Sequence, residues 1–146
     1  MTLEPSADSR PFSPISLDHV VIRAIAIEPM LHFYRDVLGC AVAKHNEPLG
    51  LWHLRAGPTM IDLIDMTGSL GLTGGPPPGR VGHNMDHLCL RIHPFDVDVV
   101  RNFLGGHGIK TEPPGRRFGA QGDGLSLYVK DPEGNSIELR GNKEGP

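Results

Sequence analysis

The sequence predicts an α+β protein in which paired βαβββ modules form a cupped, mixed β-sheet with the helices on the outside. Three observations lead to this fold class: one octad occurs twice, a helical pattern follows each copy, and similar strands close the two halves. A four-stranded sheet with one helix covers only one of its faces, so the other face needs a partner. A second module of the same kind supplies that partner.

The first strand of each half is predicted from the two octads, residues 17–24 and 85–92. Both read apolar, Asp, His, three apolar residues, Arg, apolar, and such a similarity within one chain indicates a duplicated unit. Side chains alternate between the two faces of a strand. Each octad therefore directs aliphatic side chains to one face and its histidine, His19 or His87, to the other.

A helix is predicted after each octad, over residues 29–38 in the first half and 95–104 in the second. Glycine follows both segments, as it commonly does where helices end. Both segments carry apolar side chains at helical spacing. These stripes consist of Leu31, Tyr34, Val37 and Leu38 in the first helix, and of Val99, Val100, Phe103 and Leu104 in the second.

Three strand-like runs follow each helix, which completes the βαβββ order. The closing runs of the two halves match, since Met60-Ile61-Asp62-Leu63 corresponds to Ser136-Ile137-Glu138-Leu139. Alternation places Asp62 and Glu138 on the faces opposite their aliphatic neighbours. The predicted runs cover residues 41–44, 51–55 and 60–65 in the first half, and 109–112, 125–129 and 136–140 in the second.

Composition divides the chain into a tail, two modules and a connector, which together make one domain. Residues 1–15 are polar and proline-rich and predict a flexible tail. Residues 68–82 are rich in glycine and proline, a composition typical of a linker without secondary structure. The first module then covers residues 16–67 and the second covers residues 83–146.

Charge and hydropathy exclude several classes of function. The net charge is −3 and no basic cluster is present, which argues against nucleic acid and anionic membranes as partners. No apolar run approaches the roughly 18 residues that a membrane span needs, and no secretory signal is visible at the start. Cys40 and Cys89 are far apart and form no C-x-x-C pair. The sequence therefore predicts a cytoplasmic protein with reduced thiols.

The inner faces of the predicted sheets carry His19, His87 and Glu138 from three separate strands. Two imidazoles and a carboxylate suit one divalent metal ion, namely Fe, Mn, Ni, Zn or Co, and a cation removes the cost of burying the carboxylate. A single histidine is more often a half-buried residue bonded to the backbone. Its repetition at equivalent positions favours a metal site. Asp62 is either a fourth ligand or a polar residue near the rim.

The remaining polar features are predicted around this site. Residues 115–124 form a glycine-rich stretch that is read either as a mobile lid, with Arg117 and Gln121 facing a polar substrate, or as a plain hairpin loop. Residues 131–135, Asp-Pro-Glu-Gly-Asn, predict a tight turn that aims the strand of Glu138. The histidines without repeat partners are expected at the surface, with His53 and His83 the nearest to the cavity.

Four motifs resemble the vicinal oxygen chelate superfamily, which contains glyoxalases, bleomycin resistance proteins and dioxygenases. They are residues 17–20, 33–39, 85–88 and 127–139, and the similarity is closest to small glyoxalase-domain proteins. The resemblance implies metal ligation by His19, His87 and Glu138, with Asp62 where glyoxalases usually have a glutamate. Tyr128 is shared with ring-cleaving dioxygenases, but residues 118–121 lack the histidine of their pattern.

The expected function is that of a glyoxalase-type lyase or isomerase. The metal would bind adjacent oxygens of a small substrate and stabilise an enediolate or oxyanion, while Glu138 or Asp62 moves a proton. Tyr128 is a further candidate catalytic residue. One alternative is an Fe(II) extradiol-type dioxygenase, because two histidines and a carboxylate also match its ligand set. The other is a metal-free small-molecule binding or resistance protein.

A complete site needs one first half facing one second half, because His19 and Asp62 lie in the first and His87 and Glu138 in the second. The linker could fold the two halves of one chain together. Two chains related by two-fold symmetry would instead form two equivalent sites, each with ligands from both subunits. We expect a homodimer with shared sites, since a domain this small also gains buried apolar area by dimerising.

Overall fold

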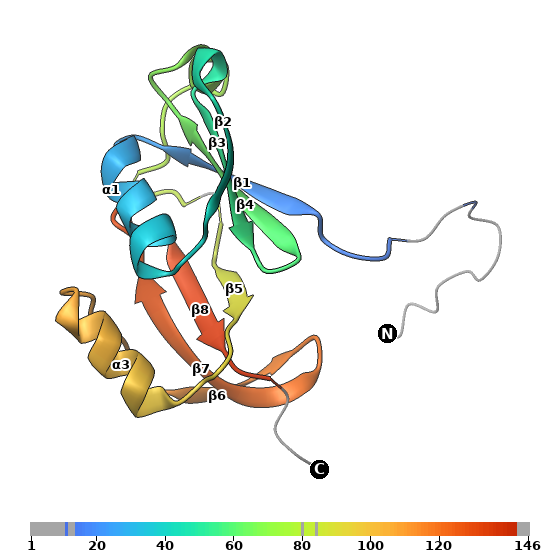
Figure 1. Cartoon of the computed structure of the whole chain (residues 1–146), viewed down its shortest axis with the longest axis vertical. Helices are drawn as coiled ribbons and strands as arrows, with labels where there is room; N and C mark the ends of the chain where they lie inside the picture. The colour runs from blue at the N-terminus through green and yellow to red at the C-terminus, as the bar shows by residue number, and fades with distance from the viewer. Residues whose placement is uncertain (1–10, 12–13, 80, 84, 143–146) are drawn as a thin grey trace.

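Two four-stranded sheets form the molecule, in the order β1-β4-β3-β2 and β5-β8-β7-β6 (Figure 1). The computed structural model describes residues 11, 14–79, 81–83 and 85–142; the predicted tail lies largely outside these residues. In each sheet the first strand is parallel to the last, and the other pairs are antiparallel. The predicted α+β fold of two βαβββ modules with mixed sheets is confirmed.

The first sheet packs its aliphatic side chains on the core and carries the predicted inner, polar face on its other side. Val21 of the first strand lies opposite Asp62 of the last, and Asp62 lies opposite His53, so these three residues form one row across the inner face. Gly57 turns the hairpin between the last two strands with a φ of 62°, a conformation that glycine adopts without strain. The strands are β1 His19–Ala24, β2 Val42–Asn46, β3 Leu51–Ala56 and β4 Thr59–Asp65.

The second sheet repeats this order but corrects two predictions. Residues 109–112 form no strand: two prolines follow them, and their one backbone bond to the sheet is from Glu112 N to Tyr128 O. Residues 115–124 form a hairpin, as one of their two interpretations expects, but they pair as strands instead of forming an open loop, and Gly122, with a φ of 104°, follows the turn at residues 120–121. The strands are β5 Leu88–Arg91, β6 Gly115–Gly119, β7 Gly122–Lys130 and β8 Ser136–Arg140.

The helices lie near the predicted segments. Helix α1 (Ile27–Leu31) continues into a π-helical stretch, η1 (His32–Val37), and α3 (Val97–Gly106) begins at Asp96, whose carboxylate accepts from Val99 N. The predicted stripe of α3 is half correct: Val100 and Leu104 pack on the core, whereas Val99 and Phe103 are exposed. Helix η2 (Glu47–Leu49) is a short 3₁₀ turn.

The connector contains an element that composition did not predict. Helix α2 (Ser69–Leu72) begins directly after β4 and packs on its end. Gly71 allows this contact, because a Cβ at that position would collide with the backbone of Asp65 and Met66. The expectation of a linker without secondary structure is therefore wrong for its first residues.

Side-chain bonds join the two modules of one chain. The Tyr34 hydroxyl donates to Asp131 Oδ2 over 2.7 Å in a buried setting, and the Glu133 carboxylate accepts from the backbone N–H groups of Ile25 and Ala26. The turn that aims β8 thus also holds the start of α1, which lies against the β7–β8 end of the second sheet in Figure 1. The core continues from one module into the other.

No helix in the described part of the chain is both long and apolar enough to cross a membrane. Strands β1 and β5, which carry or adjoin the two repeated histidines, each lie at one edge of their sheet, and β2 and β6 lie at the other edges.

Candidate functional site

The second module gathers three polar side chains around Glu138. The Glu138 carboxylate is 4% exposed and accepts hydrogen bonds from Ser126 Oγ at 2.6 Å and from Tyr128 Oη at 2.9 Å. His87 Nε2 lies 3.2 Å from its Oε1 atom. Register explains the cluster, because Tyr128 lies opposite Glu138 and Ser126 is two residues earlier on the same face of β7.

The charge of Glu138 is maintained by these neighbours. Burial acts to raise the pKa of its carboxyl, but the hydrogen bonds from Ser126 and Tyr128 and the proximity of His87 outweigh it, so the pKa is lowered. A carboxylate that stays ionised in a buried setting is suited to hold a cation. Burial and the same carboxylate raise the pKa of the Tyr128 phenol, so this side chain remains a donor at neutral pH.

The first module has its own polar cluster on the inner face. His53 Nδ1 lies 3.0 Å from Asp62 Oδ2, and Asp62 is 4% exposed. The second oxygen of Asp62 is buried and has no hydrogen-bond partner among the described residues. His19 is close enough for the Asp62 charge to help raise its pKa, although the hydrogen bond that its ring donates to Asp18 has the larger effect.

Both repeated histidines are oriented by the aspartate that precedes them. His19 Nδ1 donates to Asp18 at 2.6 Å, and His87 Nδ1 donates to Asp86 at 2.7 Å. A carboxylate on one ring nitrogen fixes the tautomer and leaves the other nitrogen to bind a metal. The duplicated Asp-His pair therefore has the same physical role in each module, which is to turn Nε2 outward from the pair.

The donor set fits a divalent metal only in part within one chain. His87 and Glu138 converge, whereas His19 and Asp62 remain with the first module. Among the described residues, no three His, Cys, Asp or Glu side chains group closely enough to hold a metal ion. One chain thus presents two half-sites, one histidine and one buried carboxylate in each, and the metal ligation stays a prediction.

The other predicted residues lie at different distances from this cluster. The Arg117 guanidinium is 5.8 Å from the centre of the Tyr128 ring, so it reaches the edge of the second half-site. Gln121 is exposed in the β6–β7 turn, seven residues before Tyr128, or about 23 Å away at the usual rise of a strand. The chain's own fold does not bring Gln121 to Glu138, and its role in binding substrate stays a prediction.

Sequence reasoning missed several residues of these clusters. Alternation in β7 could have indicated Ser126, two positions before Tyr128. Cys89 lies opposite Glu138 in the register, and partial burial and this carboxylate raise the pKa of its thiol to about 11. Arg140 is buried two residues after Glu138 and donates to Gly122 O at 2.9 Å. The contact between His53 and Asp62 depends on strand pairing and leaves no local signal.

Comparison with known proteins agrees with this architecture. A family model described as the Glyoxalase/Bleomycin resistance protein/Dioxygenase superfamily matches residues 16–139. The chain is 35% identical over 132 residues to RDO1 of Mycosarcoma maydis, named a glyoxalase domain-containing protein, with 89% of this chain and 70% of that protein covered.

Solved structures show the same fold. An integron cassette protein from the mobile metagenome of V. cholerae has a TM-score of 0.72 at 26% identity, over 90% of this chain and 98% of that chain. The lactoylglutathione lyase of Agrobacterium tumefaciens has a TM-score of 0.65 at 25% identity, over 89% of this chain and 96% of that chain. The family match spans most of the residues, and this chain belongs to the glyoxalase/bleomycin resistance protein/dioxygenase superfamily.

Proposed function

We propose that this protein is a divalent-metal-dependent lyase or isomerase of glyoxalase type, active as a homodimer with shared sites. The observation that carries the proposal is the half-site of the second module, where His87 Nε2 faces the buried, ionised Glu138 at 3.2 Å. His19, oriented by Asp18 in the same way, supplies the third donor. The structural similarity to a lactoylglutathione lyase supports this class of reaction.

The dimer follows from where the half-sites lie. The bonds from Tyr34 of η1 and from the Ile25 backbone to the turn at residues 131–135 hold the two modules of one chain in an arrangement that leaves His19 apart from Glu138. A second copy related by two-fold symmetry brings the first module of one chain to the second module of the other. Each pairing of a first module with the second module of the other chain then contains one complete donor set, so the dimer has two equivalent sites.

The chain's own residues would perform the proton transfer. When bound, the metal supplies Lewis-acid stabilisation to two adjacent oxygens of a small substrate. Asp62 has a buried oxygen without a hydrogen-bond partner and is the candidate base that takes a proton from the substrate carbon. His53 holds the other oxygen of Asp62 and orients it. Returning the same proton to the neighbouring carbon completes an isomerisation without any net change of atoms or electrons.

Tyr128 and Arg117 would act on the substrate from the second module. The Tyr128 hydroxyl donates to Glu138, which keeps this carboxylate available as a metal ligand instead of a proton acceptor. Arg117 lies over the Tyr128 ring and offers a positive charge at the edge of the half-site. We place the protein in the cytoplasm, where the two unpaired thiols of Cys40 and Cys89 stay reduced.

Metal analysis tests the ligand set. Protein purified without chelator should contain about one divalent ion per chain, and His87→Ala should lose it while the circular dichroism spectrum is unchanged. His32→Ala is the matched control, because His32 pairs with Asp36 on the exposed side of the π-helical stretch. Equal metal content in both variants would refute ligation by His87.

Subunit mixing tests whether the site is shared. His19→Ala and Glu138→Ala proteins each lack one ligand, yet a heterodimer of the two contains one intact site if ligands come from both chains. Because the two-fold dimer has two sites and the heterodimer keeps one of them, mixing should restore at most about half a metal ion per chain. Proven subunit exchange without recovered metal binding would place each site within one chain.

A further inference from the structure

Positive charge is concentrated on the inner faces of the two sheets, the faces on which Asp62 and Glu138 lie. Alternation along the described strands places seven of the chain's 14 lysine and arginine residues on these faces, but two of its 17 aspartate and glutamate residues. The chain as a whole has a net charge of −3. The excess therefore lies around the candidate metal ligands, and a bound divalent ion would add to it.

The second module contributes four of these positive side chains: Arg91, Arg117, Lys130 and Arg140. Arg91 and Arg140 lie directly opposite each other on neighbouring strands, and like charges in such positions destabilise a sheet. Arg140 is 3% exposed, and its Nε has no hydrogen-bond partner among the described residues. Its guanidinium lies 3.9 Å from Glu138 Oε2. When Glu138 holds a metal, its charge is shared with that cation, so Arg140 needs another anion nearby.

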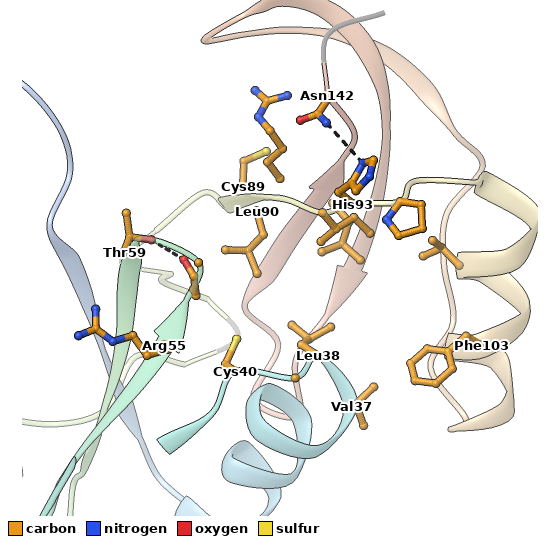
Figure 2. A pocket seen from close by; sticks show the side chains of 18 of the residues that line it. Val37, Leu38, Cys40, Arg55, Thr59, Cys89, Leu90, His93, Phe103 and Asn142 are labelled. Atoms are coloured by element: carbon orange, nitrogen blue, oxygen red, sulfur yellow. Dashed lines mark hydrogen bonds between the residues drawn. The ribbon is translucent and has the colours of Figure 1, made fainter. Parts of the chain in front are cut away.

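The first module adds three positive side chains: Arg23, Lys44 and Arg55. Lys44 lies opposite His53, and Arg55 is two residues after His53 on the same face of β3. Neither Lys44 nor Arg55 forms an ion pair with a carboxylate of the described residues. Arg55 borders a cavity of about 820 Å³, and Figure 2 shows its side chain extending away from the apolar residues Val37 and Phe103 of the cavity wall.

We propose that the site takes an anionic substrate, a small molecule that carries a carboxylate or phosphate group in addition to its two adjacent oxygens, and that Arg117 contacts this group. The Arg117 side chain is exposed, and its guanidinium carbon lies 5.8 Å from the centre of the Tyr128 ring. Tyr128 in turn donates to Glu138 at 2.9 Å. The inference rests on the proposed function for the two adjacent oxygens that the metal would bind.

The two arginines beside Glu138 have different roles in this proposal. The planar, exposed guanidinium of Arg117 can donate two parallel hydrogen bonds to a carboxylate or a phosphate. Arg140 is buried, so its charge is screened less by salt than a surface charge and attracts an anion without touching it. A recess lined by charges of one sign also raises the local concentration of the oppositely charged ligand. Arg117 is therefore the contact residue, and Arg140 strengthens the field behind it.

Thermal unfolding of metal-free, full-length protein, dialysed free of chelator, tests for the anion. A ligand that binds the folded state raises the melting temperature as its concentration rises. The probes are malate, which carries carboxylates, and glycerol 3-phosphate, with malamide and glycerol as their neutral counterparts. At matched ionic strength at least one anion should raise the melting temperature while its neutral counterpart does not. The anion with the larger shift identifies which group the site prefers, carboxylate or phosphate.

Variants assign the contact to Arg117. R117Q should lower the affinity for the anion about 10-fold or more, because it removes charge-assisted hydrogen bonds. R117K keeps the charge without the planar fork and should retain part of the affinity. R35Q is the matched control, because Arg35 pairs with Asp36 on η1 and the substitution removes the same charge.

Three results would overturn the inference. The first is a wild-type protein whose melting temperature responds to neither anion, or equally to an anion and its neutral counterpart. The second is an R117Q variant that binds the anion as tightly as wild type. The third is an equal loss of affinity in R35Q and R117Q, which would make the effect one of net charge.

The outcome also separates this inference from the proposed function, since the titration uses metal-free protein. Anion binding that depends on Arg117, in a protein that never binds metal, would support the anion site and reject the metal-dependent reaction. Metal bound by a protein that responds to neither anion would support the ligand set and reject the anionic substrate.

Discussion

Tyr34 and Asp131 are 97 residues apart in sequence and share a buried hydrogen bond of 2.7 Å from the phenol to Oδ2. The bond joins the helical segment of the first module to the turn of the second. Asp131 also accepts from the backbone N–H groups of Glu133 and Asn135, so one carboxylate shapes the turn and fixes the position of the first module. Its partner Tyr34 is the residue that can be changed without breaking the turn.

Tyr34→Phe should lower the free energy of unfolding by about 1.5–3 kcal/mol, the usual range for a hydrogen bond to a charged acceptor. Burial and the Asp131 charge raise the pKa of Tyr34 in the folded state. The wild-type stability from this group is thus complete below about pH 10, where free tyrosine titrates, and declines at higher pH. Urea unfolding of both proteins at neutral pH and near pH 10.5 tests the stability difference and its pH dependence. If wild type and Tyr34→Phe differed by the same free energy of unfolding at both pH values, the predicted pH dependence would be wrong.

Ser126→Ala should weaken metal binding without removing it. The substitution removes the 2.6 Å hydrogen bond that the Ser126 hydroxyl donates to the Glu138 carboxylate. The pKa of the Glu138 carboxyl should then rise, and protons should compete better with the metal for this carboxylate. Residues that support a ligand typically contribute about 10-fold or more in affinity. Chelator competition measures the change. Ser136→Ala is the control, because Ser136 accepts from Lys130 at the exposed start of β8; an equal loss there would refute the explanation.

Asp62→Asn separates a ligand from a base. In the proposed mechanism Asp62 moves the proton, so metal affinity should stay nearly constant while turnover of a hemithioacetal falls by about 10²–10⁴-fold. His53→Gln should reduce turnover less, because it removes only the group that orients Asp62. His45→Gln, whose ring stacks on Trp52, should change neither. A large loss of metal affinity in Asp62→Asn would instead make Asp62 a fourth ligand.

Gly71→Ala should destabilise the fold by about 2–3 kcal/mol. The new Cβ would enter the backbone of Asp65 and Met66, which cannot move without disturbing the end of β4. Gly105→Ala in α3 meets nothing within 4 Å, and alanine favours a helix by about 0.5–1 kcal/mol over glycine. The two substitutions therefore have opposite expected signs in urea unfolding, and equal effects would contradict the close packing of α2.

The sequence by itself determined which residues form the repeated units. Period-two alternation in the octads and the closing strands assigns His19, His87, Asp62 and Glu138 to the inner faces. In the structure Val21, two residues after His19, lies opposite Asp62, and Cys89, two residues after His87, lies opposite Glu138. These patterns are local, since each depends on only a few successive residues. The same local logic identified the helices and the Asp-Pro-Glu-Gly-Asn turn.

Tertiary structure decided what those residues meet. The glycines of residues 115–124 predict a lid or a plain hairpin loop, but three of them, Gly119, Gly122 and Gly124, lie against the buried Arg140 side chain. The His53–Asp62 contact and the bond from Tyr34 to Asp131 join positions that are distant in sequence. Contacts of this kind depend on strand register and on which surfaces exclude water, and a pattern along the sequence records neither. The same tertiary contacts keep the two half-sites apart within one chain.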